Sequence, residues 1–401
     1  KELGWGQQGE SWNFLSALKS MGGETWFQLG DRDLATHCIR TQMLGSGASL
    51  TEATRHLCEV LGVNVDLCPM TDDQVATIVH CEKEDSEGDE KTIEPMAFQH
   101  YFVRDRCQPT VTGFSFEGMD SARPSDKFLA ALKSKNLGSI LICPSNPFVS
   151  VDPVLKLPGI LEAMKKSPAP VIAVSPIVGG QAIKGPAAKM MAELGFMGMM
   201  VDPKYGGSGL DSVSYILAIT EIAKIDASAA VIMSVNNSLV CAGIEKYCNE
   251  EQKQKYLVPL AKGEVIGAFC LSEPEAGSDA TSQKTTAIDK GDHYLLNGTK
   301  NWITNGSSAS TYIVIAQTDI EKGHKGINAF IVEKSWAGFE IGIKEKKMGI
   351  RGSDTHSLMF TDVKVPKENR IGEDGFGFNF AMAVLNGGRI GIASQALGIA
   401  K

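Results

Sequence analysis

The feature that most constrains this 401-residue chain is a helix-forming stretch near its middle, residues 185–198. Pro186 near its start and Gly195 past its end favour the first turn and the termination of a helix. Good helix formers, such as alanine, methionine and leucine, lie between them. The spacers rich in Gly, Ser or Pro that usually join independent domains are lacking here. The sequence therefore predicts one helix over residues 186–194, stopped by Gly195, that joins two halves with separate cores.

Composition places the chain among ordinary globular proteins, with 43% apolar and 21% charged residues. The length suggests about two or three domains. A formal charge of −8 argues against nucleic-acid binding, and no apolar run approaches the roughly 20 residues of a membrane span. The nine cysteines contain no C-x-x-C pair, which indicates mostly small buried side chains in a reducing, cytoplasmic setting.

Helices are predicted for the first half at residues 12–18, 34–44 and 51–61, where apolar residues recur at helical spacing. The turn before the second of these contains Asp31 and Asp33, and either carboxylate is a candidate cap for that helix. A charged stretch at 82–91 predicts a solvated hairpin loop.

A strand–loop–helix–strand order follows at residues 139–174. Buried strands are expected at 139–143 and 171–174, with a helix from about residue 154. This order is typical of a parallel, Rossmann-like α/β sheet, in which ligands bind at the carboxyl ends of the strands. The small or polar residues at those ends suit a phosphate group, although many such turns bind nothing: Ser145, Asn146, Ser175, Gly179 and Gly180.

Four motifs in this half together resemble 2-phospho-L-lactate transferase of coenzyme F420 biosynthesis: GDRDLATH at 30–37, PMTDD at 69–73, PSNP at 144–147 and SPIVGG at 175–180. The resemblance runs from residue 1 to about 194. It implies Mg²⁺-dependent transfer of a phospholactyl-type or enolpyruvyl group from a guanosine diphosphate donor to a deazaflavin alcohol. It also makes Arg32 a candidate for acceptor binding.

Oxygen ligands are what Mg²⁺ prefers. Four carboxylates in these motifs are therefore candidates to bind the metal or to lie next to the phosphate groups: Asp31, Asp33, Asp72 and Asp73. The opening strand, glycine-rich loop and aspartate-rich segment of the family do not precede residue 1, so half of a nucleotide site is expected to be missing. The family's closing segment is also expected to be missing beyond residue 194.

In the second half, Asp211 predicts the N-cap of a helix that extends to about residue 225. An almost wholly apolar helix at 228–247 is expected to be buried, and a polar amphipathic helix is expected at 250–262. Between residues 265 and 365 the spacing of apolar residues changes from the 3.6 residues of a helix to the 2 residues of a strand. This pattern predicts an antiparallel β-domain with strands at 294–304, 311–317, 327–332 and 358–363. A final helix is expected from about 376 onward.

The stretch AFCLSEPEAGSD at 268–279, at the start of this β-domain, is expected to be a strand that ends in a turn containing Pro and Gly. Its backbone N–H groups and hydroxyls suit a ligand with a diphosphate and a carbonyl-rich ring, although Ser272 and Ser278 can equally close a turn. Trp302 and Thr304 offer a flat apolar surface and a hydroxyl for such a ring. For a lone tryptophan, core packing is the more frequent role.

Five motifs of this half resemble a short-chain acyl-CoA dehydrogenase over residues 190–401: YGGSG at 205–209, LSEPEAGSD at 271–279, GTKNWITNG at 298–306, MGIRGS at 348–353 and GGR at 387–389. The resemblance implies FAD, oxidation of an acyl-CoA between its α and β carbons, and electron delivery to an electron-transfer flavoprotein. The positions that match flavin contacts are Phe269, Leu271, Ser272, Gly277, Ser278, Trp302, Ile303 and Thr304. Ser278 also matches a CoA contact, and Arg389 matches a substrate-side arginine.

Parts of this second family are expected to be missing as well. Its first helices and most of its C-terminal bundle, which supplies the catalytic glutamate, subunit contacts and a wall of the FAD site, do not match. Some relatives carry the glutamate just before the arginine, where this chain has Gly388, and Asn386 replaces an expected aspartate. No catalytic residue is assigned, weak FAD binding is expected, and the homo-oligomer of the parent families is doubtful here.

The expected organisation is multidomain: residues 1–194 as the transferase-like α/β domain, 195–263 as helices, 264–370 as the β-domain and 371–401 as the first helix of a bundle. Three interpretations stay open: a bifunctional enzyme, a nucleotide- or flavin-binding remnant without turnover, and a hybrid joined within the shared MAELG at 191–195. The hybrid is favoured, with both activities impaired. The alternative is a transferase acting in coenzyme F420 biosynthesis.

Overall fold

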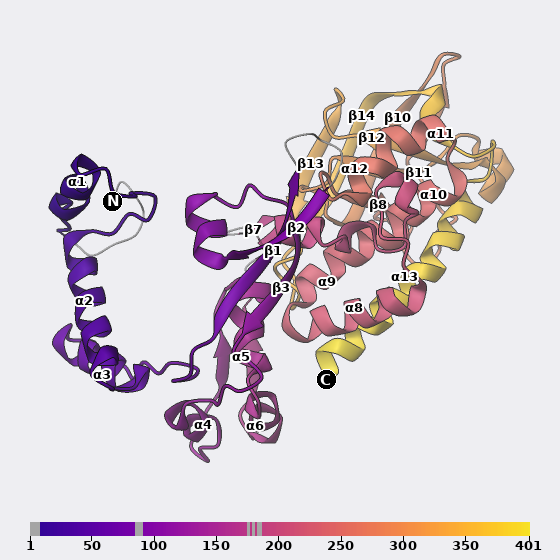
Figure 1. The fold of residues 1–401 in the computed structure, drawn as a ribbon. Coiled ribbons are helices and arrows are strands. Elements are labelled where there is room, and N and C mark those ends of the chain that lie inside the picture. Colours follow the sequence, from indigo (N-terminus) through magenta and orange to yellow (C-terminus); the bar gives the residue numbers. More distant parts are fainter. Residues whose placement is uncertain (1–8, 85–90, 175–176, 179–180, 183–186) are drawn as a thin grey trace. The chain divides into compact units, whose positions relative to one another are not determined.

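The structure, a computed structural model, describes residues 9–84, 91–174, 177–178, 181–182 and 187–401. Contacts divide the chain into two units, Lys1–Ile172 and Ala173–Lys401 (Figure 1). The division precedes the helix-forming stretch near the middle of the chain, which lies in the second unit. The predicted domain boundaries, which are finer than this division, stay a prediction.

The first unit begins with three helices close to the predicted ranges: α1 (Asn13–Ser20), α2 (Asp31–Gly45) and α3 (Leu50–Val60). A reciprocal capping box between Ser49 and Glu52 starts α3. Helix α2 has Gly30 at its N-cap and no side-chain cap. The carboxylate of Asp31 instead accepts hydrogen bonds from the backbone N–H groups of Asn13 and Phe14. The expectation that Asp31 caps its own helix was wrong, because the first turn of α1 lies within reach of it.

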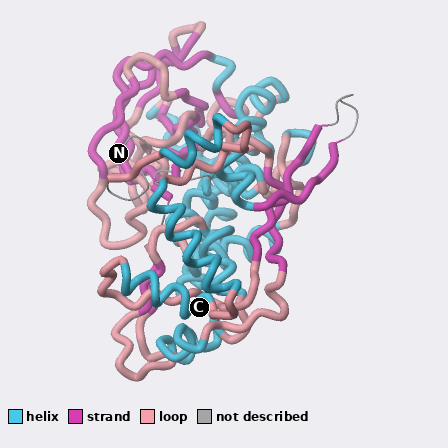
Figure 2. Tube along the Cα trace, turned by 60° about the vertical axis from the view of Figure 1, so that its left-hand side comes forward, coloured by secondary structure: helices cyan, strands magenta, loops and turns pink. Residues whose placement is uncertain are grey.

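Two small sheets follow in this unit. Strands β1 (Ala76–Glu84) and β2 (Lys91–Ala97) pair antiparallel, as predicted for a hairpin, and β3 (Val111–Glu117) lies on the other side of β1 (Figure 2). Strands β4 (Ile140–Ile142) and β5 (Val171–Ala173) form the second sheet. Leu141, Val171 and Ile172 are each about half exposed, so the expectation that these strands are buried fails among the described residues. The Rossmann-like parallel sheet stays a prediction.

One apolar cluster of the first unit lies around its short helices. It joins the end of β3 to three short helices, α4 (Asp126–Leu132), α5 (Asp152–Lys156) and α6 (Ile160–Lys166). Its fully buried members are Met119, Ala122, Leu132, Leu157, Ile160 and Ala163. One-turn π-helical segments lie at His100–Arg104 (η1) and Pro147–Val151 (η2).

The helix-forming stretch becomes α7 (Ala187–Glu193), which ends before Gly195. The backbone of Gly195 has a φ of 76°, the left-handed conformation of a helix C-cap. The stop signal read from the sequence is therefore confirmed, while Pro186 lies outside the described residues.

Helix α8 (Ser212–Ile225) begins at its predicted cap, where the carboxylate of Asp211 accepts from the N–H of Ser214. The apolar run Ala227–Tyr247 is helical throughout, as α9 (Ala227–Ser234), the π-helical η5 (Val235–Cys241) and α10 (Ala242–Tyr247). By length and composition it could cross a membrane, but 83% of its apolar window is buried inside the unit, as in the core helix of a globular domain. The third predicted helix comprises α11 (Glu250–Gln252), η6 (Lys253–Leu257) and α12 (Val258–Ala261).

An eight-stranded sheet follows, in the order β13-β14-β10-β9-β11-β12-β15, with β8 on β11. All pairs are antiparallel except β8 and β9 against β11. The strands are β8 (Gly267–Cys270), β9 (Thr286–Asp289), β10 (His293–Thr304), β11 (Thr311–Gln317), β12 (Ile327–Glu333), β13 (Phe339–Lys344), β14 (Thr355–Pro366) and β15 (Arg370–Ile371). The predicted strands are confirmed. Strands β10 and β14 mix buried and more exposed residues, as half-buried strands do, whereas β11 and β12 are mostly apolar runs that are buried almost throughout.

Two apolar cores lie on opposite faces of this sheet. Side chains of η5, α10 and the last helix, α13 (Gly377–Ala400), pack on one face with Ile313, Ile315 and Ile331. The other face holds Tyr312, Val314 and Phe330 in a core made only by the β-domain. Strand β11 is buried on both faces and joins the helices to the β-domain.

One buried side chain ties the helices to the start of the sheet. Asn236 in η5 donates to the carbonyls of Met197 and Leu260 and accepts from the N–H of Gly267, the first residue of β8. Asn236 is fully buried, so no water can replace these contacts.

We expect Asn236→Ala to destabilise the second unit by about 3 kcal/mol, because two carbonyls and one N–H lose their partner in a dry core. Urea unfolding followed by circular dichroism measures this loss. The exposed Asn386→Ala is the matched control and should change stability by less than about 0.5 kcal/mol. Equal effects of the two variants would contradict the assignment.

Candidate functional site

The candidate site of the second unit starts where β8 ends. Loop 271–279 turns sharply after Ser272, because Glu273 and Ala276 exchange backbone hydrogen bonds. Gly277, Ser278 and Asp279 are exposed at the end of this turn. A Cβ on Gly277 would meet no heavy atom within 4 Å, so the loop presents an open backbone surface.

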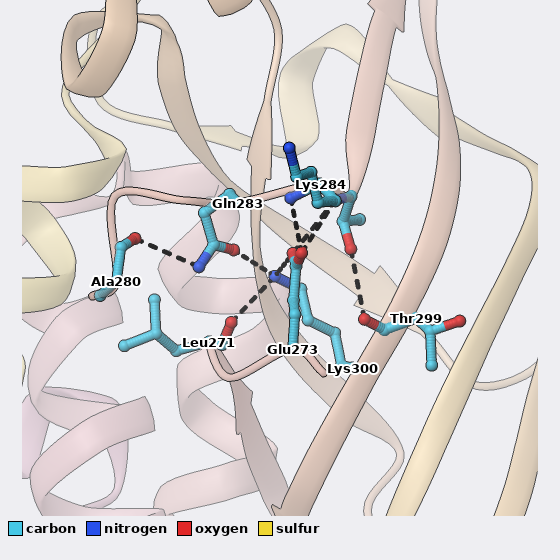
Figure 3. A network of polar contacts seen from close by, with 8 residues as sticks. Leu271, Glu273, Ala280, Gln283, Lys284, Thr299 and Lys300 are labelled. Carbon is cyan, nitrogen blue, oxygen red and sulfur yellow. Dashed lines mark hydrogen bonds and ion pairs between the residues drawn. The ribbon is translucent and has the colours of Figure 1, made fainter. Parts of the chain in front are cut away.

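Strand β10 holds this loop from the side. The Nζ of Lys300 donates to the carbonyl of Leu271 at 3.0 Å (Figure 3), and the N–H of Asn301 donates to the carbonyl of Ser272 at 2.8 Å. Leu271 and Ser272 therefore lie beside the strand that carries Trp302, Ile303 and Thr304. These two predicted groups of flavin contacts are brought together.

Trp302 is the most unusual residue of this arrangement. Its side chain is 62% exposed, and its backbone has a φ of 62°, in the left-handed region that non-glycine residues rarely adopt. The pairing of β10 with β14 shifts register between Lys300 and Ile303. Such a bulge redirects a side chain, and here it leaves a large apolar ring uncovered beside loop 271–279.

The other predicted flavin contacts differ in exposure. Ile303 is buried in the core of the β-domain, and Phe269 belongs to the core between sheet and helices. Ser278 is exposed, and Thr304 is half-buried at the end of β10. Asp279 accepts hydrogen bonds from Ser282 and Thr281, which lower the pKa of its carboxyl group, the Ser282 hydroxyl contributing most. The exposed carboxylate of Asp279 therefore gives the end of the loop a negative charge in solvent.

A second feature of this unit is an apolar groove between η5 and α13, with a volume of about 470 Å³. Leu239 and Leu385 line it together with Gly388 and Arg389. Arg389 is exposed and donates to the Oδ1 of Asn386 at 2.6 Å. Among the described residues that line this groove there is no carboxylate.

A polar centre that was not predicted lies beneath loop 271–279 and consists of Lys300, Glu273 and Gln283 (Figure 3). The signal was present, because Lys300 continues the inward alternation of Tyr294 and Leu296 along β10. A lysine at an inward position of a strand is rarely fully buried unless it is paired.

The predicted aspartates of the first unit lie in two separate pairs. Asp31 and Asp33 are in the first turn of α2, a 15-residue helix that spans about 22 Å, and Asp72 and Asp73 lie near the start of α3, beyond its other end. Asp72 accepts from the N–H and hydroxyl of Thr51, and Asp73 accepts from the N–H of Arg123. Among the described residues, no three His, Cys, Asp or Glu side chains form a metal-binding group.

The remaining predicted residues of this unit also have local roles. Asn146 accepts from the N–H groups of Phe148 and Val149 at the start of η2, and Ser145 precedes it, half-buried. The backbone N–H of Arg32 donates to Glu10. Ser175, Gly179 and Gly180 lie outside the described residues.

Comparisons with known proteins match two families along the chain. The family model described as 2-phospho-L-lactate transferase CofD matches residues 12–256. The chain belongs to this family. The model described as acyl-CoA dehydrogenase, middle domain, matches residues 268–363.

Relatives of the second family match at high identity. Short-chain specific acyl-CoA dehydrogenase of Clostridium acetobutylicum is 54% identical over 213 residues, 53% of this chain and 56% of that protein. The human mitochondrial short-chain enzyme is 51% identical over 218 residues, 54% of this chain and 53% of that protein. The structure of butyryl-CoA dehydrogenase from Megasphaera elsdenii aligns with a TM-score of 0.52 at 52% identity, over 53% of this chain and 57% of that one.

The chain spans about half the length of these relatives. Fewer than 213 residues follow residue 256, so the dehydrogenase match overlaps the transferase match. The transferase match ends at residue 256, beyond the boundary near 194 that sequence analysis placed. The multidomain fold and the similarity to both families are confirmed.

The capping role of Asp72 yields a test of the magnesium hypothesis. We expect Asp72→Ala to destabilise the first unit by about 1 kcal/mol, because α3 loses an acceptor at its first turn. Thermal unfolding should show the same loss with and without millimolar Mg²⁺. A stabilisation of the unmodified protein by Mg²⁺ that Asp72→Ala abolishes would instead indicate a metal ligand.

Proposed function

We propose that this chain joins an FAD-binding, acyl-CoA dehydrogenase-like module to a 2-phospho-L-lactate transferase-like module, and that both activities are impaired. The observation that carries the first part is the position of loop 271–279 beside the exposed ring of Trp302. An open glycine, the exposed Ser278 and an uncovered aromatic ring fit a diphosphate joined to a planar ring. The residues present therefore fit FAD.

In this proposal the loop binds the diphosphate through Ser272, Gly277 and Ser278, while Trp302 and Thr304 orient the ring. Bound flavin would supply the hydride acceptor for oxidation of an acyl-CoA. The groove between η5 and α13 holds the acyl chain away from water, with Arg389 at its edge on the substrate side. An electron-transfer flavoprotein is the proposed acceptor partner, as the resemblance implies. A solved structure described as electron transferring flavoprotein of Acidaminococcus fermentans is 53% identical at a TM-score of 0.52, over 52% of this chain and 55% of that one.

The dehydrogenase activity is impaired in this proposal because the groove between η5 and α13 is lined by no carboxylate among the described residues. Removal of a proton next to a thioester needs a positioned general base, which contributes roughly 10²–10⁴-fold. Gly388 stands where some relatives carry that base, and a Cβ on Gly388 would lie 2.7 Å from the side chain of Leu239. Glu273 is paired with Lys300 in the interior and cannot serve.

For the transferase-like module, we propose that Arg32 contacts a deazaflavin alcohol and that Ser145 and Asn146 lie near a guanosine diphosphate donor. Mg²⁺ remains part of this proposal through the pair Asp31 and Asp33 rather than through all four carboxylates, because Asp72 caps α3. The matching family model supports the proposal. A non-catalytic hybrid is the alternative outcome if neither ligand binds.

Added FAD should quench the fluorescence of Trp302, because the ring stacks on an exposed indole. Trp302→Ala should weaken FAD binding about tenfold, which corresponds to about 1.4 kcal/mol. Trp26→Phe, in the first unit, is the control and should leave the affinity unchanged. We also expect the complex to lose FAD on gel filtration, and retention of stoichiometric FAD would contradict weak binding.

With excess FAD, butyryl-CoA and a dye acceptor, the chain should turn over at least about 10²-fold more slowly than an intact relative, because the groove lacks a base. Gly388→Glu places a carboxylate there and should raise the rate, with Gly388→Gln as the control. Turnover of the unmodified chain near that of the relative would contradict the proposal and mean that another carboxylate reaches the substrate.

A further inference from the structure

We propose that Lys300 is a positioning residue whose ammonium group holds loop 271–279 in its binding conformation, and that loss of its proton releases the loop. The Lys300 network consists of Lys300, Glu273, Gln283 and the carbonyl of Leu271. The ligand named in the test, FAD, rests on the proposed function above, whereas the network itself does not.

The geometry around the Lys300 nitrogen requires three donors. Its Nζ lies 3.0 Å from the carbonyl oxygen of Leu271, 2.6 Å from Oε1 of Glu273 and 2.5 Å from Oε1 of Gln283. All three partners are acceptors. The amide of Gln283 cannot turn without loss, because its Nε2 donates to the carbonyl of Ala280 at 3.2 Å.

An ammonium group has three N–H donors, and a neutral amine has two donors and a lone pair. After deprotonation one of the three oxygens must therefore face a lone pair. Lys300 and Leu358, its partner across the strand pair, are fully buried, so the nitrogen of Lys300 has no contact with bulk solvent. Two of the three partners are uncharged, and the side chain of Gln283 is held by a second hydrogen bond, to the carbonyl of Ala280. We therefore expect the carbonyl of Leu271 to separate first.

Glu273 connects the network to the far side of the loop. Its Oε2 accepts from the N–H of Lys284 at 2.6 Å and from that of Thr285 at 3.2 Å. The Lys300–Glu273 ion pair thus joins β10, loop 271–279 and the segment before β9 (Figure 3). Movement of the ion pair displaces Leu271 and Ser272 relative to Trp302.

The proton on Lys300 is lost at moderately alkaline pH. Burial lowers the pKa of Lys300 to about 8, while the carboxylate of Glu273 opposes this shift. The other titratable group that acts on it is Cys270 on β8, and burial raises the pKa of that thiol. The side chains of Lys284 and Glu275 are exposed. Lys300 is therefore the group of the network that titrates between pH 7 and 9.

The pH dependence of folding stability distinguishes a positioning role of Lys300 from a merely structural role. The pKa of Lys300 is lower in the folded state, about 8, than its ordinary value of 10.5. Between these values the unfolded chain binds more protons, so a rise in pH favours the folded state. Alkaline pH should weaken ligand binding by the loop without weakening the fold through Lys300.

If only the protonated form binds FAD, the apparent affinity follows the protonated fraction and falls about tenfold from about pH 7 to about pH 9. FAD titrations of Lys300→Met should show weak binding that is flat over this range. Lys290→Met, at an exposed lysine after β9, should keep the tenfold change. A tenfold change that persists in Lys300→Met would overturn the proposal.

Lys300→Met leaves Glu273 buried without its cation, so the double variant Lys300→Met/Glu273→Gln provides a neutral interior. It should fold and bind FAD as weakly and as independently of pH as the single variant. Tight binding by the double variant would overturn the proposal.

Lysine Cε NMR of the unmodified chain tests the network without FAD. One signal, absent from Lys300→Met, should titrate near 8, and amide exchange of Asn301 should increase in Lys300→Met at constant pH. If the unmodified chain binds no FAD, the proposed function fails while these results still decide on the network. A Lys300 signal that titrates near the ordinary value of 10.5 would overturn the network.

Discussion

The second unit depends on how one short, buried strand satisfies its backbone. Strand β8 pairs with β11 along one edge, and polar side chains serve the groups that remain. Asn236 accepts from the N–H of Gly267, Asn305 donates to the carbonyl of Gly267, and Lys300 donates to the carbonyl of Leu271. Buried backbone groups without partners are costly. These three side chains therefore fix where the strand starts, where it ends and where loop 271–279 begins.

The need to pair these buried backbone groups also connects loop 271–279 to the interior of the second unit. Asn236 comes from the buried helical run, and Lys300 and Asn305 come from either end of the segment that contains Trp302. The strand that presents the aromatic ring is thus also the strand that positions the loop. A change in the interior at Lys300 is transmitted to the surface through one carbonyl and one ion pair.

The overlap of the two family matches has a structural counterpart. The transferase match extends to residue 256, into helices whose buried residues, such as Val240, Ile244 and Leu257, share a core with the β-domain. Contacts likewise assign α7 to the second unit. The core of the second unit therefore begins within the matched transferase region, and the two families cannot be separated at a linker.

The sequence by itself determined the periodic elements. Helix α8 with its cap at Asp211, the stop at Gly195 and the strands of the β-domain follow from local patterns, because capping groups and alternation act within a few residues. The flavin-like motifs also selected a loop and a strand that the structure brings together. Only the tertiary structure decided what polar residues do: Asp31 and Asp72 contact the first turns of other helices, and Lys300 binds beneath a loop nearly thirty residues away. A carboxylate or ammonium group has the same chemistry in all of these roles, and its partners depend on long-range packing that local sequence does not encode.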